Sequence, residues 1–320
     1  MHLASATSFP FCRRSELLTS TSVSTATRSG LVCLVGAGLL AGTGGLLGTL
    51  LHRATGLSPV SVATCRLAVG GLLLIAVLAV TRRPWPRDIV AWRRIGAVAV
   101  LSAVVQASFF GAVAASSVSL ATLITIGMSP VVVALLEQLT GRRVLDRRRA
   151  VTIGIALFGL VLLVGAPRNH AGAGGIFAGA AMALVSACAF ATMTVISARP
   201  VPGLDAITTT GFGITGGAVL LIPAAAISGL TFSPTTHSIV LVVALGLMPS
   251  AVASTLYFRG LSRSGAGTAA VLALLEPLTG ATLAAAMLGE RLTSTGLVGA
   301  ALLTVALVRT SVQPRTGGAV

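Results

Sequence analysis

Long apolar runs recur along almost the whole 320-residue chain, and they leave little else from which to build a fold. Charged side chains make up only 9% of the residues, whereas a soluble domain carries roughly 25%. So much apolar surface has to be buried in lipid, and a helix of about 20 residues crosses the hydrocarbon core. The sequence therefore predicts an all-α integral membrane protein. Clusters of Arg, Pro, Gly and Ser divide it into ten predicted transmembrane helices: 31–51, 59–81, 95–113, 119–140, 150–167, 175–198, 206–228, 238–258, 267–288 and 293–309.

The distribution of arginine predicts the orientation of these helices. Eighteen of the 22 basic residues fall in segments on one side, three fall on the other, and Arg66 lies within a span. Because cytoplasmic loops carry the excess of basic residues, we expect both termini in the cytoplasm and a multi-pass protein of the bacterial cytoplasmic membrane. Residues 1–29 are rich in Ser and Thr and lack the apolar core of a signal peptide, so they are interpreted as a disordered cytoplasmic tail. Residues 311–320 are interpreted as a cytoplasmic C-terminal tail.

The two halves of the chain resemble each other in the same order. GLSPVSVATCRLAVGGLLLI (56–75) aligns with GLDAITTTGFGITGGAVLLI (203–222), and SAVVQASFFG (102–111) aligns with SAVASTLYFR (250–259). Since each half holds five spans, the second half enters the membrane upside down. The sequence therefore predicts two inverted five-helix repeats, at 30–168 and 172–310. Inverted repeats are typical of secondary transporters, whose binding site lies near the bilayer midplane.

Several stretches resemble the EamA-type family of the drug/metabolite transporter superfamily. GTGGLLGTLL and SPVSVATCRLAVGGLLL are similar to its first two helices. SPVVVALLEQLTGRR and LLEPLTGATLAAAMLGERLTSTGLVGAALLTVALV resemble its repeated signature, a proline-containing helix that ends in G-E-R-L and is followed by another span. The first copy departs from this pattern, with GRR at 141–143 in place of GER. Over residues 30–310, the resemblance implies ten helices in two inverted bundles, a central cavity, and export or exchange of small metabolites.

An acidic residue followed by a proline interrupts the ninth apolar run. Glu276 lies about 15 Å from the start of its span, at 1.5 Å per residue, which is near the middle of the membrane. A carboxylate at that depth faces the bundle interior and marks a substrate or proton pathway, or else it is a protonated acid with a structural hydrogen bond. Pro277 is expected to free the carbonyl of Ala273, unless it is a simple packing kink.

Further candidates for substrate or proton binding lie in other spans. Arg66 is about 11 Å below the outer face, where it pairs with Glu276, binds an anionic substrate group, or extends its side chain towards the interface. Gln106, Phe110 and Tyr257 supply an amide and aromatic rings suited to the wall of a small-molecule cavity, although packing of the rings is the alternative. Ser129 and Pro130 occupy the position in the first half that matches Glu276 and Pro277, without a charge, and a simple packing kink is the alternative for Pro130. The stretch GAGLLAGTGGLLG (36–48) is rich in small residues and predicts close helix approach.

These observations predict a secondary transporter of small organic metabolites, working by export or exchange through alternating access, with proton coupling at Glu276 as a hypothesis. No nucleotide-binding motif, metal pattern or cofactor motif is visible, and no enzyme activity is expected. Two alternatives are an integral-membrane lipid-processing enzyme, which requires clustered His, Asp or Ser, and a non-transporting membrane scaffold. The expected partners are a small-molecule substrate and the lipid bilayer, without nucleic acid, and a homodimer is left open.

Overall fold

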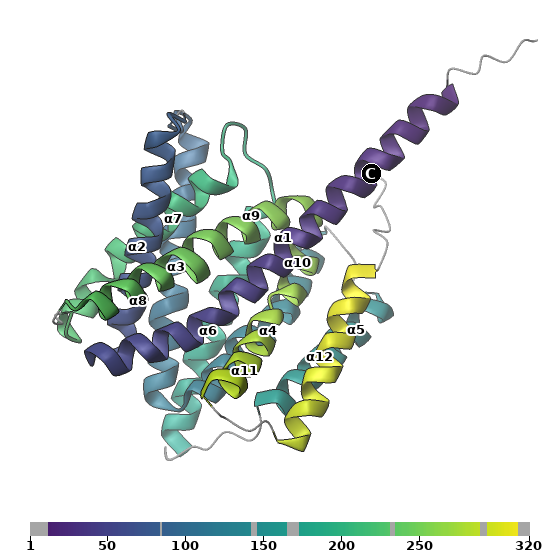
Figure 1. Ribbon diagram of the computed structural model, residues 1–320. Coiled ribbons are helices and arrows are strands. Elements are labelled where there is room, and N and C mark those ends of the chain that lie inside the picture. The colour runs from purple at the N-terminus through teal and green to yellow at the C-terminus, as the bar shows by residue number, and fades with distance from the viewer. Residues whose placement is uncertain are drawn as a thin grey trace, which may run out of the picture.

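The computed structural model describes residues 12–83, 85–141, 146–164, 173–230, 234–288 and 293–312. Apart from an isolated bridge between Val201 and Leu204, the regular structure in these ranges is helical, and the helices form one bundle (Figure 1). The elements are α1 (Cys12–Thr55), α2 (Pro59–Val80), α3 (Ile89–Ala115), α4 (Val118–Leu139), α5 (Arg147–Val164), α6 (Ala173–Ser197), α7 (Ala206–Ile227), α8 (Thr236–Gly246), the π-helix η1 (Leu247–Val252), α9 (Ala253–Ser264), α10 (Ala266–Leu272), α11 (Leu275–Leu288) and α12 (Ser294–Val312).

The helices combine into ten segments, in agreement with the predicted number. The elements α8, η1 and α9 form the eighth segment, and α10 and α11 form the ninth. Nine segments in the described ranges are long and apolar enough to cross a membrane. The remaining one, α5, begins with three consecutive arginines and is therefore less apolar, but it packs lengthwise against α12 at one edge of the bundle (Figure 1). The structure thus confirms an all-α membrane fold.

Side-chain caps determine where several helices begin. Ser58 and Ser117 accept hydrogen bonds from the backbone N–H groups of Ser61 and Leu120, at the starts of α2 and α4. A side-chain oxygen at this position satisfies an N–H group that has no partner within the helix. Asp88 accepts from the N–H of Val90 at 3.0 Å, so that α3 begins six residues before the predicted start at 95. The cap therefore adds a first turn that is separated from the predicted apolar run by Arg93 and Arg94.

The packing of helices follows a two-fold pattern. The helix α3 packs against α6 and α7. The corresponding segment of the other half makes the equivalent contacts, because α9 packs against α1, the counterpart of α6, and α8 packs against α2, the counterpart of α7. Likewise α4 packs against α6, and α11 packs against α1. The pairs α2 with α7 and α5 with α12 map onto themselves. The contacts are consistent with an internal repeat, and the inversion of one repeat relative to the other stays a prediction.

Glycines allow helices of the two halves to touch backbone to backbone. A Cβ atom on Gly70 would lie 2.6 Å from the carbonyl oxygen of Gly246, and one on Gly159 would lie 2.9 Å from the carbonyl oxygen of Gly299. In α1, Gly38 faces Leu272 and Leu275 at similarly short range, which confirms the close approach predicted for 36–48. Small residues of this kind replace the hydrophobic effect as the basis of helix association in lipid.

The start of α1 differs from the prediction. The helix begins at Cys12 and extends away from the bundle before it enters it (Figure 1). It therefore includes residues 12–29 of the segment that we interpreted as a disordered tail, while residues 1–11 lie outside the described ranges. Helix propagation explains the difference, because adding a residue to an existing helix is far easier than nucleating a new one.

Candidate functional site

The ninth segment is interrupted at the predicted position. The helix α10 ends at Leu272 and α11 begins at Leu275, so Glu276 and Pro277 lie in the first turn of α11. The carbonyl oxygen of Ala273 accepts a hydrogen bond from the N–H of Glu276 at 3.0 Å. Our expectation that Pro277 frees this carbonyl is therefore wrong, because a tighter turn supplies a substitute donor.

The first helix lies directly over this interruption. A Cβ atom on Gly42 would be 2.8 Å from the carbonyl oxygen of Glu276 and 2.5 Å from the Cβ of Thr279. Glycine is thus required at position 42 for the observed distance between α1 and α11. As a result, the small-residue stretch of α1 lies directly against the backbone at Glu276.

Arg66 of α2 faces the same region of α1. A Cβ atom on Gly44 would lie 3.4 Å from an Nη atom of Arg66, which places the guanidinium beside α1 and inside the bundle. The Nε atom of Arg66 is buried and has no hydrogen-bond partner in the described part of the chain. Arg66 and Glu276, two predicted residues from opposite halves of the sequence, therefore both lie against the Gly42–Gly44 stretch of α1.

The π-helix in the eighth segment also reaches this region, and sequence reasoning missed it. Pro249 of η1 packs against Gly44, where a Cβ atom would lie 3.2 Å from the Cβ of Pro249. Proline has no N–H group to donate to the carbonyl four residues earlier. Here the hydroxyl of Ser250 donates to that carbonyl, of Leu245, at 3.3 Å. A proline followed by serine in the middle of a span was the available signal, because helix breaks in transporters are repaired in this way.

The other predicted candidates are distributed over the bundle. Gln106 is buried on α3, and Ser129 is fully buried on α4 with a hydroxyl that has no partner among the described residues. Pro130 lies inside α4, which continues past it without a break. The ring of Phe110 contacts that of Phe109 edge to face, with centroids 5.2 Å apart.

Tyr257 joins α9 to α6. Its hydroxyl oxygen lies 2.8 Å from Oγ1 of Thr194, and its ring lies against Phe190, with centroids 5.7 Å apart. Phe190 and Tyr257 also pack against the largest buried cluster of the bundle. These contacts give Tyr257 a structural role between α6 and α9, two helices of the second repeat.

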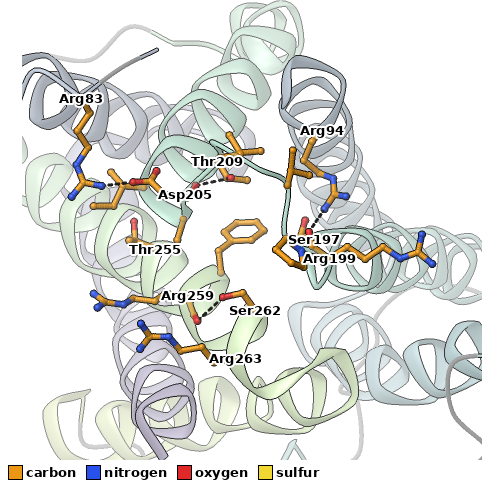
Figure 2. Close-up of a pocket in the computed structure, with 16 residues that line it drawn as sticks. Arg83, Arg94, Ser197, Arg199, Asp205, Thr209, Thr255, Arg259, Ser262 and Arg263 are labelled. Atoms are coloured by element: carbon orange, nitrogen blue, oxygen red, sulfur yellow. Dashed lines mark hydrogen bonds and ion pairs between the residues drawn. The ribbon is translucent and has the colours of Figure 1, made fainter. Parts of the chain in front are cut away.

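A second polar region is a pocket at the end of the bundle where α2, α6 and α9 finish and α3 and α7 begin (Figure 2). The cavity has a volume of about 430 Å³. Its wall includes five arginines, which we call the pocket arginines: Arg83, Arg94, Arg199, Arg259 and Arg263. In the view of Figure 2, Arg83, Arg259 and Arg263 lie on one side of the opening and Arg94 lies on the other. Sequence reasoning assigned these residues to loops and did not bring them together.

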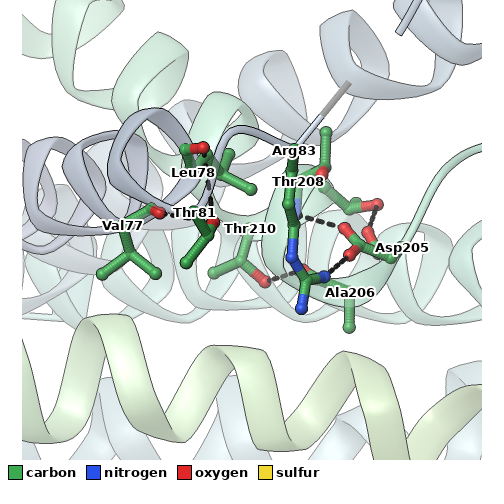
Figure 3. Close-up of polar contacts among 9 residues, drawn as sticks. Val77, Leu78, Thr81, Arg83, Asp205, Ala206, Thr208 and Thr210 are labelled. Carbon is green, nitrogen blue, oxygen red and sulfur yellow. Dashed lines mark hydrogen bonds and ion pairs between the residues drawn. The ribbon is translucent and has the colours of Figure 1, made fainter. Parts of the chain in front are cut away.

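Asp205 lies at the edge of this pocket and has two partners (Figure 3). It forms an ion pair with Arg83, and it caps α7 by accepting a hydrogen bond from the N–H of Thr208 at 2.8 Å. Burial alone would raise the pKa of Asp205, but the hydrogen bonds from Thr208 and the positive charge of Arg83 outweigh burial, so its pKa lies below the ordinary value. Asp205 is therefore an ion-paired helix cap.

Comparison with known proteins adds independent information. The model of the EamA-like transporter family matches residues 28–165 and 177–312. An uncharacterized transporter of Bacillus subtilis (strain 168), YwfM, is 27% identical over 258 residues, which cover 81% of this chain and 86% of that protein. An uncharacterized transporter of Archaeoglobus fulgidus is 30% identical over 207 residues, covering 64% and 71%. A solved crystal structure with 19% identity has a TM-score of 0.75 and covers 90% of this chain and 98% of its own, which shows a shared fold.

Proposed function

The chain belongs to the EamA-like transporter family, and from this premise we propose that it is a secondary transporter that exports or exchanges small organic metabolites by alternating access. As a multi-pass membrane protein, it has the many spans that such a transporter requires. We place it in the cytoplasmic membrane with both termini in the cytoplasm, on the basis of the arginine distribution. In this proposal the repeats at 30–168 and 172–310 are the two units that move against each other.

The observation that supports the proposal is that Arg66 and Glu276 both lie against the Gly42–Gly44 stretch of α1 inside the bundle. Ionisable residues within membrane spans are costly, and they occur mainly where they line substrate or ion pathways. Both residues lie beside irregular helices, because Glu276 follows the break between α10 and α11, and Arg66 lies near η1. Discontinuous helices at the centre of two repeats form the binding site in many secondary transporters.

The same pair offers a mechanism of coupling to protons. When Glu276 is ionised, Arg66 is its counter-ion, and when a proton neutralises Glu276, Arg66 is released to attract a negatively charged group of the substrate. Proton binding and binding of an anionic substrate then favour each other at one site. Proton movement would thereby drive substrate movement in the same direction.

Purified protein in sealed proteoliposomes tests this function. With metabolite mixtures inside the vesicles, an imposed pH gradient should accelerate the loss of at least one metabolite relative to protein-free vesicles. Glu276→Gln keeps the size and hydrogen-bonding capacity of the side chain but removes its charge, and it should abolish the dependence of transport on the gradient while leaving insertion into the membrane intact. Residual flux without gradient dependence is compatible with the proposal.

A matched control is Glu137→Gln, the same change at a buried glutamate near the end of α4, 3.4 Å from an Nη atom of Arg149. This control should keep gradient-driven transport. If transport by Glu276→Gln still depended on the gradient, the proposal of proton coupling at Glu276 would be refuted. Absence of any flux, together with modified lipid products in the vesicles, would favour the lipid-processing enzyme. Absence of both would favour the scaffold.

A further inference from the structure

The pocket at the end of the bundle has an unbalanced charge. Asp205 is the one carboxylate among the described residues that line it, whereas the pocket arginines number five. Asp205 forms its ion pair with Arg83. The lining residues therefore carry four positive charges in excess around a cavity of about 430 Å³.

Topology alone does not explain this convergence. The positive-inside rule requires arginines in cytoplasmic loops, but it does not require them to surround one cavity. Here they come from three separate places in the sequence: the α2–α3 connection with the first turns of α3, the end of α6, and the last turns of α9. Bringing like charges together costs free energy, and a bound anion would offset that cost.

The wall of the pocket supplies further groups that suit an organic anion. The hydroxyls of Ser197 and Thr255 line the cavity, and their oxygen atoms are buried without a hydrogen-bond partner in the described ranges. The aromatic ring of Phe258 and the side chain of Ile207 provide apolar surface in the same cavity. Guanidinium groups bind carboxylates and phosphates through paired hydrogen bonds, and the apolar surface suits a small carbon body.

We propose that this pocket binds a small soluble organic anion through its carboxylate or phosphate group and delivers it to Arg66 at the centre of the bundle. The delivery step rests on the transport function proposed above, whereas binding in the pocket does not. Positive potential in a cleft raises the local concentration of anions and repels cations. The substrate class is thereby restricted to organic anions, and cationic compounds are excluded.

The headgroup of an anionic phospholipid offers the same phosphate chemistry as a soluble organic anion. We therefore test binding with protein in nanodiscs of phosphatidylcholine, which carries no net charge. Four probes of similar size serve as ligands at fixed ionic strength: phenyl phosphate and benzoate as anions, benzamide as a neutral compound and benzylammonium as a cation. Titration calorimetry measures the dissociation constants.

The two anions should bind measurably, and benzamide and benzylammonium should not. Arg259→Gln removes an exposed pocket arginine and should weaken phenyl phosphate binding about tenfold, the equivalent of one hydrogen bond to a charged group. Asp205→Asn removes the competing carboxylate and should tighten binding about threefold, as expected for a half-exposed ion pair. Arg309→Gln, the same change on exposed α12 outside the pocket, should leave binding unchanged.

Three results would overturn the proposal. These are equal binding of benzoate and benzamide, equal affinities of Arg259→Gln and Arg309→Gln for phenyl phosphate, and loss of phenyl phosphate binding when phosphatidylglycerol is added to the nanodiscs. The last result would assign the pocket to a lipid headgroup. Anion binding without flux in proteoliposomes would refute the proposed transport function but support the anion site. Flux of cations without anion binding would support the transport function but refute the anion site.

Discussion

Gly42 of α1 passes so close to Glu276 of α11 that a Cβ atom on Gly42 would lie 2.8 Å from the carbonyl oxygen of Glu276. Cβ atoms in proteins essentially never come within 3.0 Å of such neighbours. The contact connects the first and ninth segments at the point where the acidic residue interrupts the helix. Its geometry makes the role of this glycine directly testable.

Gly42→Ala should lower the thermal unfolding temperature of the purified protein. The new methyl group has to push α1 away from α11, and overpacking of this kind typically costs about 1–3 kcal/mol. Gly45→Ala is the matched control, because a Cβ atom there meets nothing within 4 Å. This control should be neutral or should stabilise by up to about 1 kcal/mol through helix propensity. Equal unfolding temperatures for the two variants would contradict the close approach.

The hydrogen bond between Thr194 and Tyr257 predicts a measurable coupling between α6 and α9. Thr194→Val and Tyr257→Phe each remove one partner, and the double variant removes both. A double-mutant cycle on the free energy of unfolding should give a coupling of about 1 kcal/mol, the usual net value of such a bond. Strict additivity of the two substitutions would show that the hydroxyls do not interact.

The lowered pKa of Asp205 predicts a dependence of stability on pH. Because the carboxyl is more acidic in the folded state, its interactions stabilise the fold above the ordinary Asp pKa of about 3.9, and this contribution disappears as the pH falls through the folded-state pKa. Asp205→Asn keeps the helix cap but loses the ion pair, which is worth less than about 1 kcal/mol at a half-exposed site.

Unfolding temperatures of wild type and Asp205→Asn should therefore differ near neutral pH and converge below about pH 4. Arg83→Gln removes the other partner and should follow the same profile. A difference between wild type and Asp205→Asn that stays constant down to acidic pH would assign the effect to the cap rather than to the charge.

The arginine asymmetry predicts which loops face the cytoplasm. In a variant without the four native cysteines, Thr236→Cys at the start of α8 should react with an impermeant thiol reagent added to intact cells. Arg148→Cys at the start of α5 should react only after the cells are permeabilised. Labelling of Arg148→Cys from outside would reverse the assigned orientation.

Much of the fold was predictable because a membrane imposes a simple rule on the sequence. Apolar runs of sufficient length between arginine and proline clusters gave the ten segments, and the spacing of Glu276 within its run predicted an acidic residue in the bundle interior. Arg66 and Glu276 were predicted to lie at similar depth, and both lie against the Gly42–Gly44 stretch of α1, while their pairing stays a prediction. These features depend on local sequence and on depth, which a single sequence contains.

The features that were missed depend on contacts between distant segments. The pocket arginines looked like topology markers because nothing in their local sequence shows that three parts of the chain converge. The ion pair of Asp205 was missed because its partner Arg83 is 122 residues away. The π-helix was missed because apolar patterning does not distinguish a π-turn from an α-turn.

The π-helix has a consequence for how the two halves relate. A π-turn takes up one residue more than an α-turn without breaking the helix. The offset between the halves is 147 residues for Gly56 and Gly203 but 148 for Ser102 and Ser250, so the second half has gained one residue before this point. Such an insertion rotates the downstream side chains while the span keeps its path through the membrane. After this insertion the two halves no longer present equivalent side chains to a transported molecule, and release to one side of the membrane need not repeat the contacts of loading from the other.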